Sequence, residues 1–268
     1  FADRITTVSP TYAQEIMSAE QGFGLQGILQ QRAAHLTGIL NGVDYKEWSP
    51  EIDPFIARRY SVNDLTGKSI CKDKLQASVG LPIKPAVPLL GMISRLTSQK
   101  GFDLVQKIFD QLMEREIQLV LLGSGEERYE SFFVTAAARF SEKFAARTGF
   151  DEALAHRIEA GADMFLMPSL YEPCGLNQMF SLKYGTIPIV RGIGGLKDTV
   201  IDYDGGRGTG FVFDKYEPQA LLKTIERALA VFTEKQSWTQ LMLRAMRMDF
   251  SWDRSAQAYS SLYQQLLR

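Results

Sequence analysis

Residues 89–123 read LLGMISRLTSQKGFDLVQKIFDQLMEREIQLVLLG: a short apolar run, an amphipathic stretch and a second apolar run. Within the amphipathic stretch, Phe102, Val105, Phe109 and Leu112 recur at the spacing of one helix face. The flanking runs are apolar without alternation, which is typical of strands covered on both faces of a sheet. This stretch therefore predicts a strand–helix–strand unit with parallel strands.

The same alternation continues along most of the chain. Candidate strands begin near Leu89, Ile117, Lys143, Asp163, Ile187 and Gly210. Consecutive strands are spaced close to the roughly 30 residues of a strand–helix–strand unit. We therefore expect an α/β fold, namely a Rossmann-like parallel sheet with helices on both faces.

Residues 1–40 fall outside this repeat. They predict a strand from Arg4 to Val8, a helix with Ser9 as N-cap and Pro10 as its first residue, and a short strand from Thr37 to Leu40. Because the segment begins in the middle of a strand–helix pattern, we interpret it as the end of another domain. The expected boundary lies after residue 40.

Residues 41–268 are expected to form the main domain. It opens with an irregular connector over residues 45–64, which contains Ser-Pro and Asp-Pro turns. Three helical stretches are expected between residues 217 and 268. The connector and these helices flank the repeating strand–helix core.

Composition excludes several classes of function. The 268 residues include 30 Lys and Arg and 31 Asp and Glu, giving a net charge of −1, which excludes nucleic-acid binding through bulk positive charge. No apolar run reaches the roughly 20 residues that cross a bilayer, so no membrane partner is expected. Two cysteines are too few for a disulfide scaffold and indicate a reducing, cytoplasmic setting. Two histidines exclude a histidine-rich metal site, and we expect no metal ligand among the site residues.

A first candidate site follows the strand that begins near Leu89. Ligands of open parallel sheets bind outside the C-terminal ends of the strands. Arg95 and Lys100 lie in the turn after this strand. Both cations and the positive end of the following helix favour an anion such as a phosphate. A solvated charged turn is the alternative interpretation.

A second candidate, YEPCGLNQ at residues 171–178, follows the strand near Asp163. Gly175 allows the backbone to approach a ligand closely, and the next helix directs free N–H groups into the turn. Glu172 is an acceptor suited to sugar hydroxyls. A capped helix start with an incidental glutamate is the alternative, and Cys174 has no evident histidine partner that would make it a nucleophile.

A third glycine-rich turn, RGIGGL at residues 191–196, opens a further helix. Asp198 and Thr199 near its start fit either a capping or a functional role. Together the three turns offer backbone N–H groups, two cations and one carboxylate. That composition is expected of a site for a diphosphate joined to a sugar, with Arg and Lys neutralising the phosphates.

Five longer motifs carry a resemblance to a known family. The chain resembles bacterial glycogen synthases and plant starch synthases through ILNGVDYKEWSP (39–50), SRLTSQKG (94–101), YEPCGLNQ (171–178), LKYGTIPIVR (182–191) and GGLKDTV (194–200). These are retaining glycosyltransferases of the GT-B type, in which two Rossmann-like domains face each other across a cleft. The resemblance implies that residues 41–268 are the C-terminal, nucleotide-sugar-binding domain and that residues 1–40 end the N-terminal domain.

The same resemblance implies roles for the candidate catalytic residues. Arg95 and Lys100 would hold the donor diphosphate and stabilise the leaving nucleotide. Glu172 would bind the transferred glucose. The backbone at Cys174, Gly175 and Leu176 would contact glucose hydroxyls and phosphate.

Further substrate-binding residues follow from the resemblance. Asn41 would reach the glucose from the interdomain side, and Asn177 is implied as another substrate-binding residue. Gly194 and Gly195 would offer N–H groups near the phosphates. Phe150 would lie against the adenine ring, although from the residues alone a core phenylalanine under the sheet edge fits equally well.

The implied reaction transfers glucose from ADP-glucose, or UDP-glucose, to the 4-hydroxyl of an α-1,4-glucan with retention of configuration and no cofactor. The family's N-terminal K-x-G-G-L loop is absent from these 268 residues, so we expect the missing N-terminal domain to be needed for activity. A plant or algal source would place the enzyme in the plastid.

Two departures from related transferases are visible. Phe180 stands where many carry a second acidic residue, and Ile193 where many carry threonine. Other classes remain as alternatives: a non-enzymatic nucleotide- or glucan-binding module, a Rossmann dehydrogenase and a glucan phosphorylase. A dehydrogenase would need G-x-G-x-x-G after its first strand, and a phosphorylase a lysine-bound pyridoxal phosphate.

Overall fold

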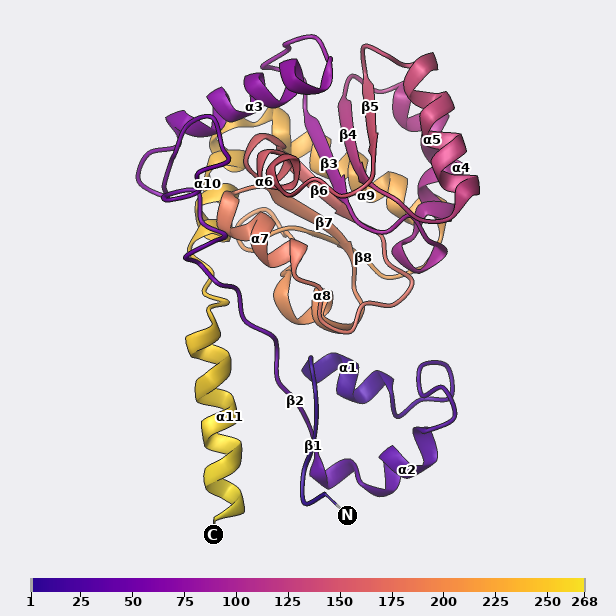
Figure 1. Ribbon diagram of the computed structural model, residues 1–268, viewed down its shortest axis with the longest axis vertical. Coiled ribbons are helices and arrows are strands. Elements are labelled where there is room, and N and C mark those ends of the chain that lie inside the picture. Colours follow the sequence, from indigo (N-terminus) through magenta and orange to yellow (C-terminus); the bar gives the residue numbers. More distant parts are fainter. Residues whose placement is uncertain (1, 268) are drawn as a thin grey trace.

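Six parallel strands form the main sheet (Figure 1). The structure is a computed structural model that describes residues 2–267. The strands of the main sheet are β3 (Leu89–Ile93), β4 (Gln118–Gly123), β5 (Phe144–Thr148), β6 (Met164–Met167), β7 (Ile187–Arg191) and β8 (Phe211–Phe213). All six predicted strands are confirmed. Their spatial order is β5-β4-β3-β6-β7-β8, so the direction of winding reverses between β3 and β6.

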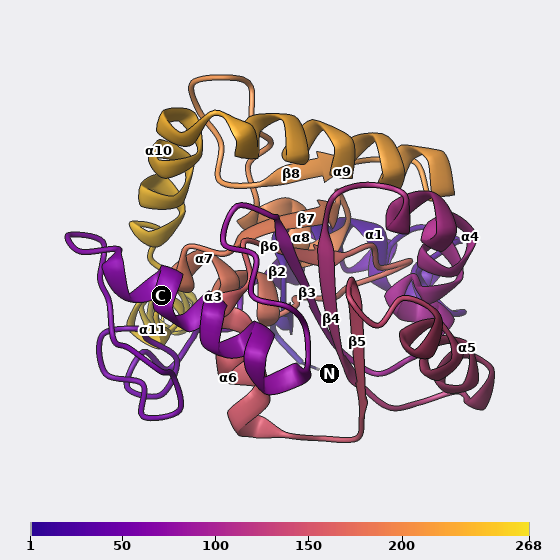
Figure 2. The same cartoon turned by 90° about the horizontal axis from the view of Figure 1, so that it is seen from above.

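Both faces of this sheet are buried under helices, as expected (Figure 2). Along β4, Leu119 and Leu121 belong to one hydrophobic core and Val120 and Leu122 to another, because successive side chains of a strand point to opposite faces. The first core includes residues of α4 (Phe102–Met113), α5 (Glu127–Arg139), α7 (Asn177–Tyr184), α9 (Pro218–Thr233) and α10 (Lys235–Met246). The second includes residues of α3 (Thr66–Val79), α6 (Glu152–Gly161) and α8 (Gly194–Thr199).

The N-terminal segment forms a separate small sheet. Its two parallel strands are β1 (Ile5–Thr7) and β2 (Leu36–Gly38), which lie close to the predicted positions. Between them are α1 (Pro10–Glu15), α2 (Gln26–Gln31) and the short 3-10 helix η1 (Ala33–His35). The predicted cap is confirmed, since the Ser9 hydroxyl accepts a hydrogen bond from the Tyr12 N–H at 2.9 Å. Helix α1 packs against α8 of the main unit.

The last helix, α11 (Trp252–Leu266), extends away from the main sheet towards the same end of the molecule as residues 2–40 (Figure 1). Its base is tied to the segment between β2 and the connector, because Ser251 pairs with Val43 and the Ser255 hydroxyl donates to the Leu40 carbonyl at 2.7 Å. Within residues 2–267, we find no helix that combines the length and the apolar character needed to span a bilayer.

Candidate functional site

A cavity of about 200 Å³ lies at the C-terminal ends of β3 and β6. This is the point where the strand order reverses, which is where open α/β sheets bind their ligands. The cavity is lined by Met92, Ile93, Ser94, Arg95, Lys100, Leu166, Met167, Ser169, Glu172, Gly175, Leu176 and Asn177. The structure thus brings both predicted cations and the predicted carboxylate to one place.

Lys100 and Glu172 contact each other directly. Lys100 ends the short 3-10 helix η2 (Ser98–Lys100), and its Nζ lies 2.6 Å from Glu172 Oε2. The Ser169 hydroxyl donates to the same oxygen at 3.0 Å. Only 7% of the Glu172 side chain and 19% of the Lys100 side chain is exposed. An ammonium has three donors, so Lys100 retains capacity for an anion while it holds Glu172.

Arg95 lies at the exposed rim of the cavity. Among described residues, its side chain donates only to Gln99 Oε1, at 3.2 Å. A guanidinium carries five N–H donors in a planar fork that matches the oxygens of phosphate. Most of these donors therefore remain available to a ligand in the cavity.

The loop that follows β6 is fixed from behind by two amide side chains. Asn177 donates from Nδ2 to the Ile93 carbonyl at 2.8 Å and so fastens the start of α7 to the end of β3. The fully buried Gln178 donates to the carbonyls of Cys174 and Gly175 at 3.0 and 3.1 Å. Gln178 and Ser169 were not among the predicted site residues. The available signals were the place of Gln178 at the end of YEPCGLNQ and that of Ser169 three residues before Glu172.

Gly194 and Gly195 form the first turn of α8 and pack against the loop that follows β6. Their N–H groups donate within the chain, from Gly194 to Glu15 Oε1 at 2.9 Å and from Gly195 to the Glu172 carbonyl at 3.1 Å. Both N–H groups thus have acceptors within the chain, and their contact with a diphosphate stays a prediction. A Cβ at either position would overlap a backbone oxygen, of Glu172 or of Cys174. The pair allows α8 to pack directly against the loop that holds Glu172.

Cys174, which belongs to this loop, and Asn41 are not among the residues that line the cavity. The Cys174 side chain is buried beside the backbone of Asn41. Burial raises the pKa of the Cys174 thiol, and a hydrogen bond from the Asn41 backbone offsets this only in part. A buried, protonated thiol is a poor nucleophile, which agrees with the backbone-only role expected for Cys174.

Phe150 is 90% exposed in the turn after β5. The alternative interpretation of a core phenylalanine is therefore wrong. The ring lies at the same edge of the sheet as the cavity, two strands away from β3, and lines a separate hollow. Contact with an adenine stays a prediction.

Asp198 caps a helix other than its own. Its carboxylate accepts from the Thr11 N–H at 3.0 Å, from the Thr11 hydroxyl at 2.6 Å and from the Ser9 hydroxyl. It thus binds the free donors at the start of α1, and it joins the N-terminal segment to α8. Thr199 instead donates to the Gly195 carbonyl of its own helix at 2.6 Å.

An open parallel sheet with a cavity at its point of strand reversal is the arrangement in which α/β proteins bind ligands. The family of glycosyl transferases group 1 matches residues 73–239, and the starch synthase catalytic domain matches residues 1–31. The chain belongs to the glycosyl transferase group 1 family.

Individual relatives agree with this assignment. A glycogen synthase of Anaeromyxobacter sp. (strain Fw109-5) is 57% identical over 267 residues, which are 99% of this chain and 56% of that protein. A glycogen synthase of Thioalkalivibrio sulfidiphilus is 50% identical over 273 residues, covering 100% of this chain and 56% of that protein. The catalytic domain of starch synthase IV from Arabidopsis thaliana, bound to ADP and acarbose, is 38% identical with a TM-score of 0.93, over 99% of this chain and 56% of that chain.

The predicted fold class and the resemblance to glycogen and starch synthases are confirmed by these findings. The chain spans about half the length of the curated relatives it matches.

Proposed function

We propose that this chain is the donor-binding part of a glycogen or starch synthase. The reaction would transfer glucose from ADP-glucose to the 4-hydroxyl of an α-1,4-glucan with retention of configuration. The observation that carries the proposal is the convergence of Arg95, Lys100 and Glu172 on one cavity at the reversal point of the sheet. The names of the relatives support the reaction, and the ADP bound to the starch synthase IV structure supports the choice of nucleotide.

The physical task of such a site is to stabilise charge. Negative charge grows on the diphosphate as its bond to glucose breaks, and fixed donors aimed at that charge lower the barrier. Arg95 and the remaining N–H groups of Lys100 would supply this compensation. Glu172, held by Lys100 and Ser169, would accept hydrogen bonds from glucose hydroxyls beside the phosphates.

The proposal includes an N-terminal domain beyond the chain. Trp252, Tyr263 and Leu266 of α11 are 45–59% exposed, and this helix extends towards the end of the molecule that holds residues 2–40 (Figure 1). We propose that the N-terminal domain packs over these apolar side chains and completes the cleft for the glucan. Alone, the chain would bind nucleotide but make little glucan. The free thiols of Cys71 and Cys174 support the cytoplasm as the compartment.

Calorimetry tests the donor site in the chain itself, with ADP, ADP-glucose and UDP-glucose titrated in parallel. Lys100→Met should weaken ADP binding about tenfold to a hundredfold, since a hydrogen bond to a charged group contributes about 1.5–3 kcal/mol. Lys107→Met is the matched control, because it removes the same charge from an exposed lysine of α4. Equal affinities for the two variants would contradict the assignment of Lys100.

Turnover requires a completed enzyme. The N-terminal half of the Anaeromyxobacter relative can be fused ahead of this chain and assayed for incorporation of glucose into glucan. Lys100→Met should lower kcat by on the order of 10²–10³ with a smaller effect on KM. Near-normal kcat in that variant would refute the catalytic role. Tight ADP binding without any glucan synthesis by the fusion would favour a non-enzymatic binding module instead.

A further inference from the structure

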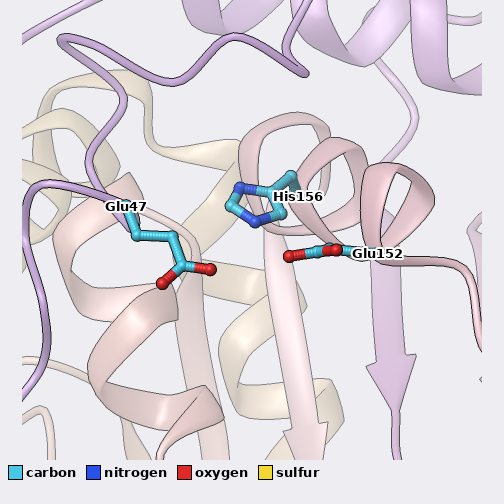
Figure 3. Close-up of side chains that lie close together, drawn as sticks. All are labelled: Glu47, Glu152 and His156. Atoms are coloured by element: carbon cyan, nitrogen blue, oxygen red, sulfur yellow. The ribbon is translucent and has the colours of Figure 1, made fainter.

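A second cluster of ligating side chains lies outside the donor cavity, between the connector and α6. Glu47, Glu152 and His156 each offer a ligand atom, and these atoms all lie within 4.8 Å of one another. Figure 3 shows both carboxylates turned towards the same edge of the imidazole ring. None of the three residues lines the donor cavity described above.

The two nitrogens of His156 have different surroundings. Nδ1 lies 2.8 Å from Asp53 Oδ2. The Asp53 carboxylate also accepts from the Tyr184 hydroxyl at 2.5 Å and from the Phe55 N–H at 2.8 Å. Since Asp53 accepts from each of these groups, it is expected to accept from Nδ1 as well, which places the imidazole proton there. Nε2 is left with a lone pair.

That lone pair is buried and unused. His156 is fully buried, and its Nε2 has no hydrogen-bond partner among the described residues. In Figure 3, Nε2 is the ring nitrogen on the side of the two carboxylates. A buried nitrogen acceptor without a hydrogen-bond partner raises the free energy of the folded chain. A ligand bound between Nε2 and the two acidic groups would remove this cost.

The neighbouring groups hold the ring in this orientation. The Trp48 indole stacks on the imidazole, with ring centroids 3.8 Å apart and planes at 15°. Because Trp48 follows Glu47 directly, the same contact brings Glu47 to the ring edge. Glu152 lies one helical turn before His156 on α6, on the same helix face. All three ligand atoms are thereby positioned by local structure.

We propose that His156 Nε2 and the carboxylates of Glu47 and Glu152 bind one divalent transition-metal ion, zinc in particular. One imidazole and two carboxylates suit zinc, which would keep a water in its fourth position. The Asp53–His156 pair is the carboxylate–histidine arrangement that commonly orients and strengthens a metal-binding imidazole. A composition with two histidines excludes a histidine-rich site but not this one.

The geometry requires only a small adjustment. Ligand atoms around a tetrahedral zinc ion lie roughly 3.4 Å apart, given metal–ligand distances of about 2.1 Å. Glu47 and Glu152 are both exposed, so their side chains can close the remaining gap while His156 stays in place. The bound ion would fasten the connector to the start of α6 and so stabilise the folded chain.

The test is a titration of Zn²⁺ into the 268-residue chain by calorimetry, with Co²⁺ absorption as a second readout of the coordination. We expect one ion per chain with micromolar affinity, an increase in Tm that EDTA reverses, and Mg²⁺ binding at least about tenfold weaker because it disfavours imidazole. Glu47→Gln and Glu152→Gln should each weaken Zn²⁺ binding by at least about tenfold, since even loss of a group behind a ligand costs that much.

Glu127→Gln is the matched control. Glu127 is the exposed first residue of α5, as Glu152 is the first residue of α6, and it forms no hydrogen bond or ion pair through its side chain with any described residue. It should leave Zn²⁺ affinity unchanged. Both glutamates of the site are exposed, so their substitution leaves the fold intact. Failure of the chain to bind Zn²⁺, equal affinity for Mg²⁺, or unchanged Zn²⁺ binding in both site variants would overturn the proposal.

Discussion

Glu159 allows a test of how burial of a carboxyl group makes the stability of this fold depend on pH. It lies on α6 and is fully buried. The Ser181 hydroxyl donates to its Oε2 at 2.7 Å, while Oε1 has no partner among the described residues. Burial raises the pKa of Glu159 to about 8, against the effects of Ser181 and Lys68, so the carboxyl is neutral in the folded chain at pH 7.

The sign of the pH dependence follows from this shift. The pKa of Glu159 is about 4.5 in the unfolded chain and about 8 in the folded one, so the folded chain binds the proton more strongly. The stabilisation is complete below pH 4.5 and is lost as pH rises towards 8. Within this window the loss is about 1.4 kcal/mol per pH unit.

Glu159→Gln removes this pH dependence. The free energy of unfolding of the variant minus that of the original chain should increase by roughly 3 kcal/mol from pH 5 to pH 7.5. The buried amide of the glutamine adds a cost of about 1–3 kcal/mol at every pH, so the change with pH, not the absolute difference, is the quantity to compare.

Urea unfolding measured from pH 5 to pH 7.5 checks this expectation. The upper limit keeps Lys68 mostly protonated, because burial lowers the pKa of Lys68 to about 8. Glu114→Gln serves as the control, since Glu114 is an exposed residue at the end of α4. Parallel curves for Glu159→Gln and the original chain would refute the argument that burial keeps this carboxyl protonated.

Two further predictions concern the contacts around the donor site. Asp198→Ala should cost about 2–3 kcal/mol, because it leaves the Thr11 donors at the start of α1 without their acceptor, and limited proteolysis should show faster cleavage within residues 2–40. Gly101→Ala should lower Tm more than Gly80→Ala and should weaken ADP binding. Both glycines have positive φ, of +79° and +85°, but only at Gly101 would a Cβ overlap a backbone oxygen, that of Pro168 beside the donor cavity. Equal Tm losses would contradict the packing argument.

Local patterns were sufficient to predict the core of the fold. Most strands of the main sheet are short apolar runs, and Ser9-Pro10 is a strong local signal for a helix start. The convergence of Arg95, Lys100 and Glu172 also followed from sequence, because parallel strands bring their C-terminal ends to one edge of the sheet.

Helix α3 was not among the predicted elements, and its composition explains why. The face that it buries includes Lys68, Lys72 and Gln76. These polar side chains find partners far along the chain, such as Asp163 for Lys72 at 2.7 Å and Gln118 for Gln76 at 2.5 Å. Hydrophobic periodicity does not detect a helix face that is buried through polar contacts.

The roles of Gly194 and Gly195 could not be read from their own turn either. A glycine-rich turn before a helix predicts free N–H groups, but which acceptor they meet depends on segments distant in sequence. Here Glu15 of the N-terminal segment supplies one acceptor and the Glu172 backbone the other. The residue type indicated close approach correctly, while the partner was set by tertiary packing.

The ion pair between Lys100 and Glu172 has the largest consequence for function. The sequence assigned Lys100 to the diphosphate and Glu172 to the glucose, as separate contacts. The 2.6 Å distance between Lys100 Nζ and Glu172 Oε2 makes the two residues a largely buried ion pair. Removing either partner would leave the other charge buried and unpaired, which destabilises the site. A bound diphosphate would share the Lys100 ammonium with Glu172, and a glucose hydroxyl donating to Glu172 would offset the weakening of the ion pair. The phosphate and sugar ends of the donor would thereby be recognised together, which favours the intact nucleotide sugar over either part alone.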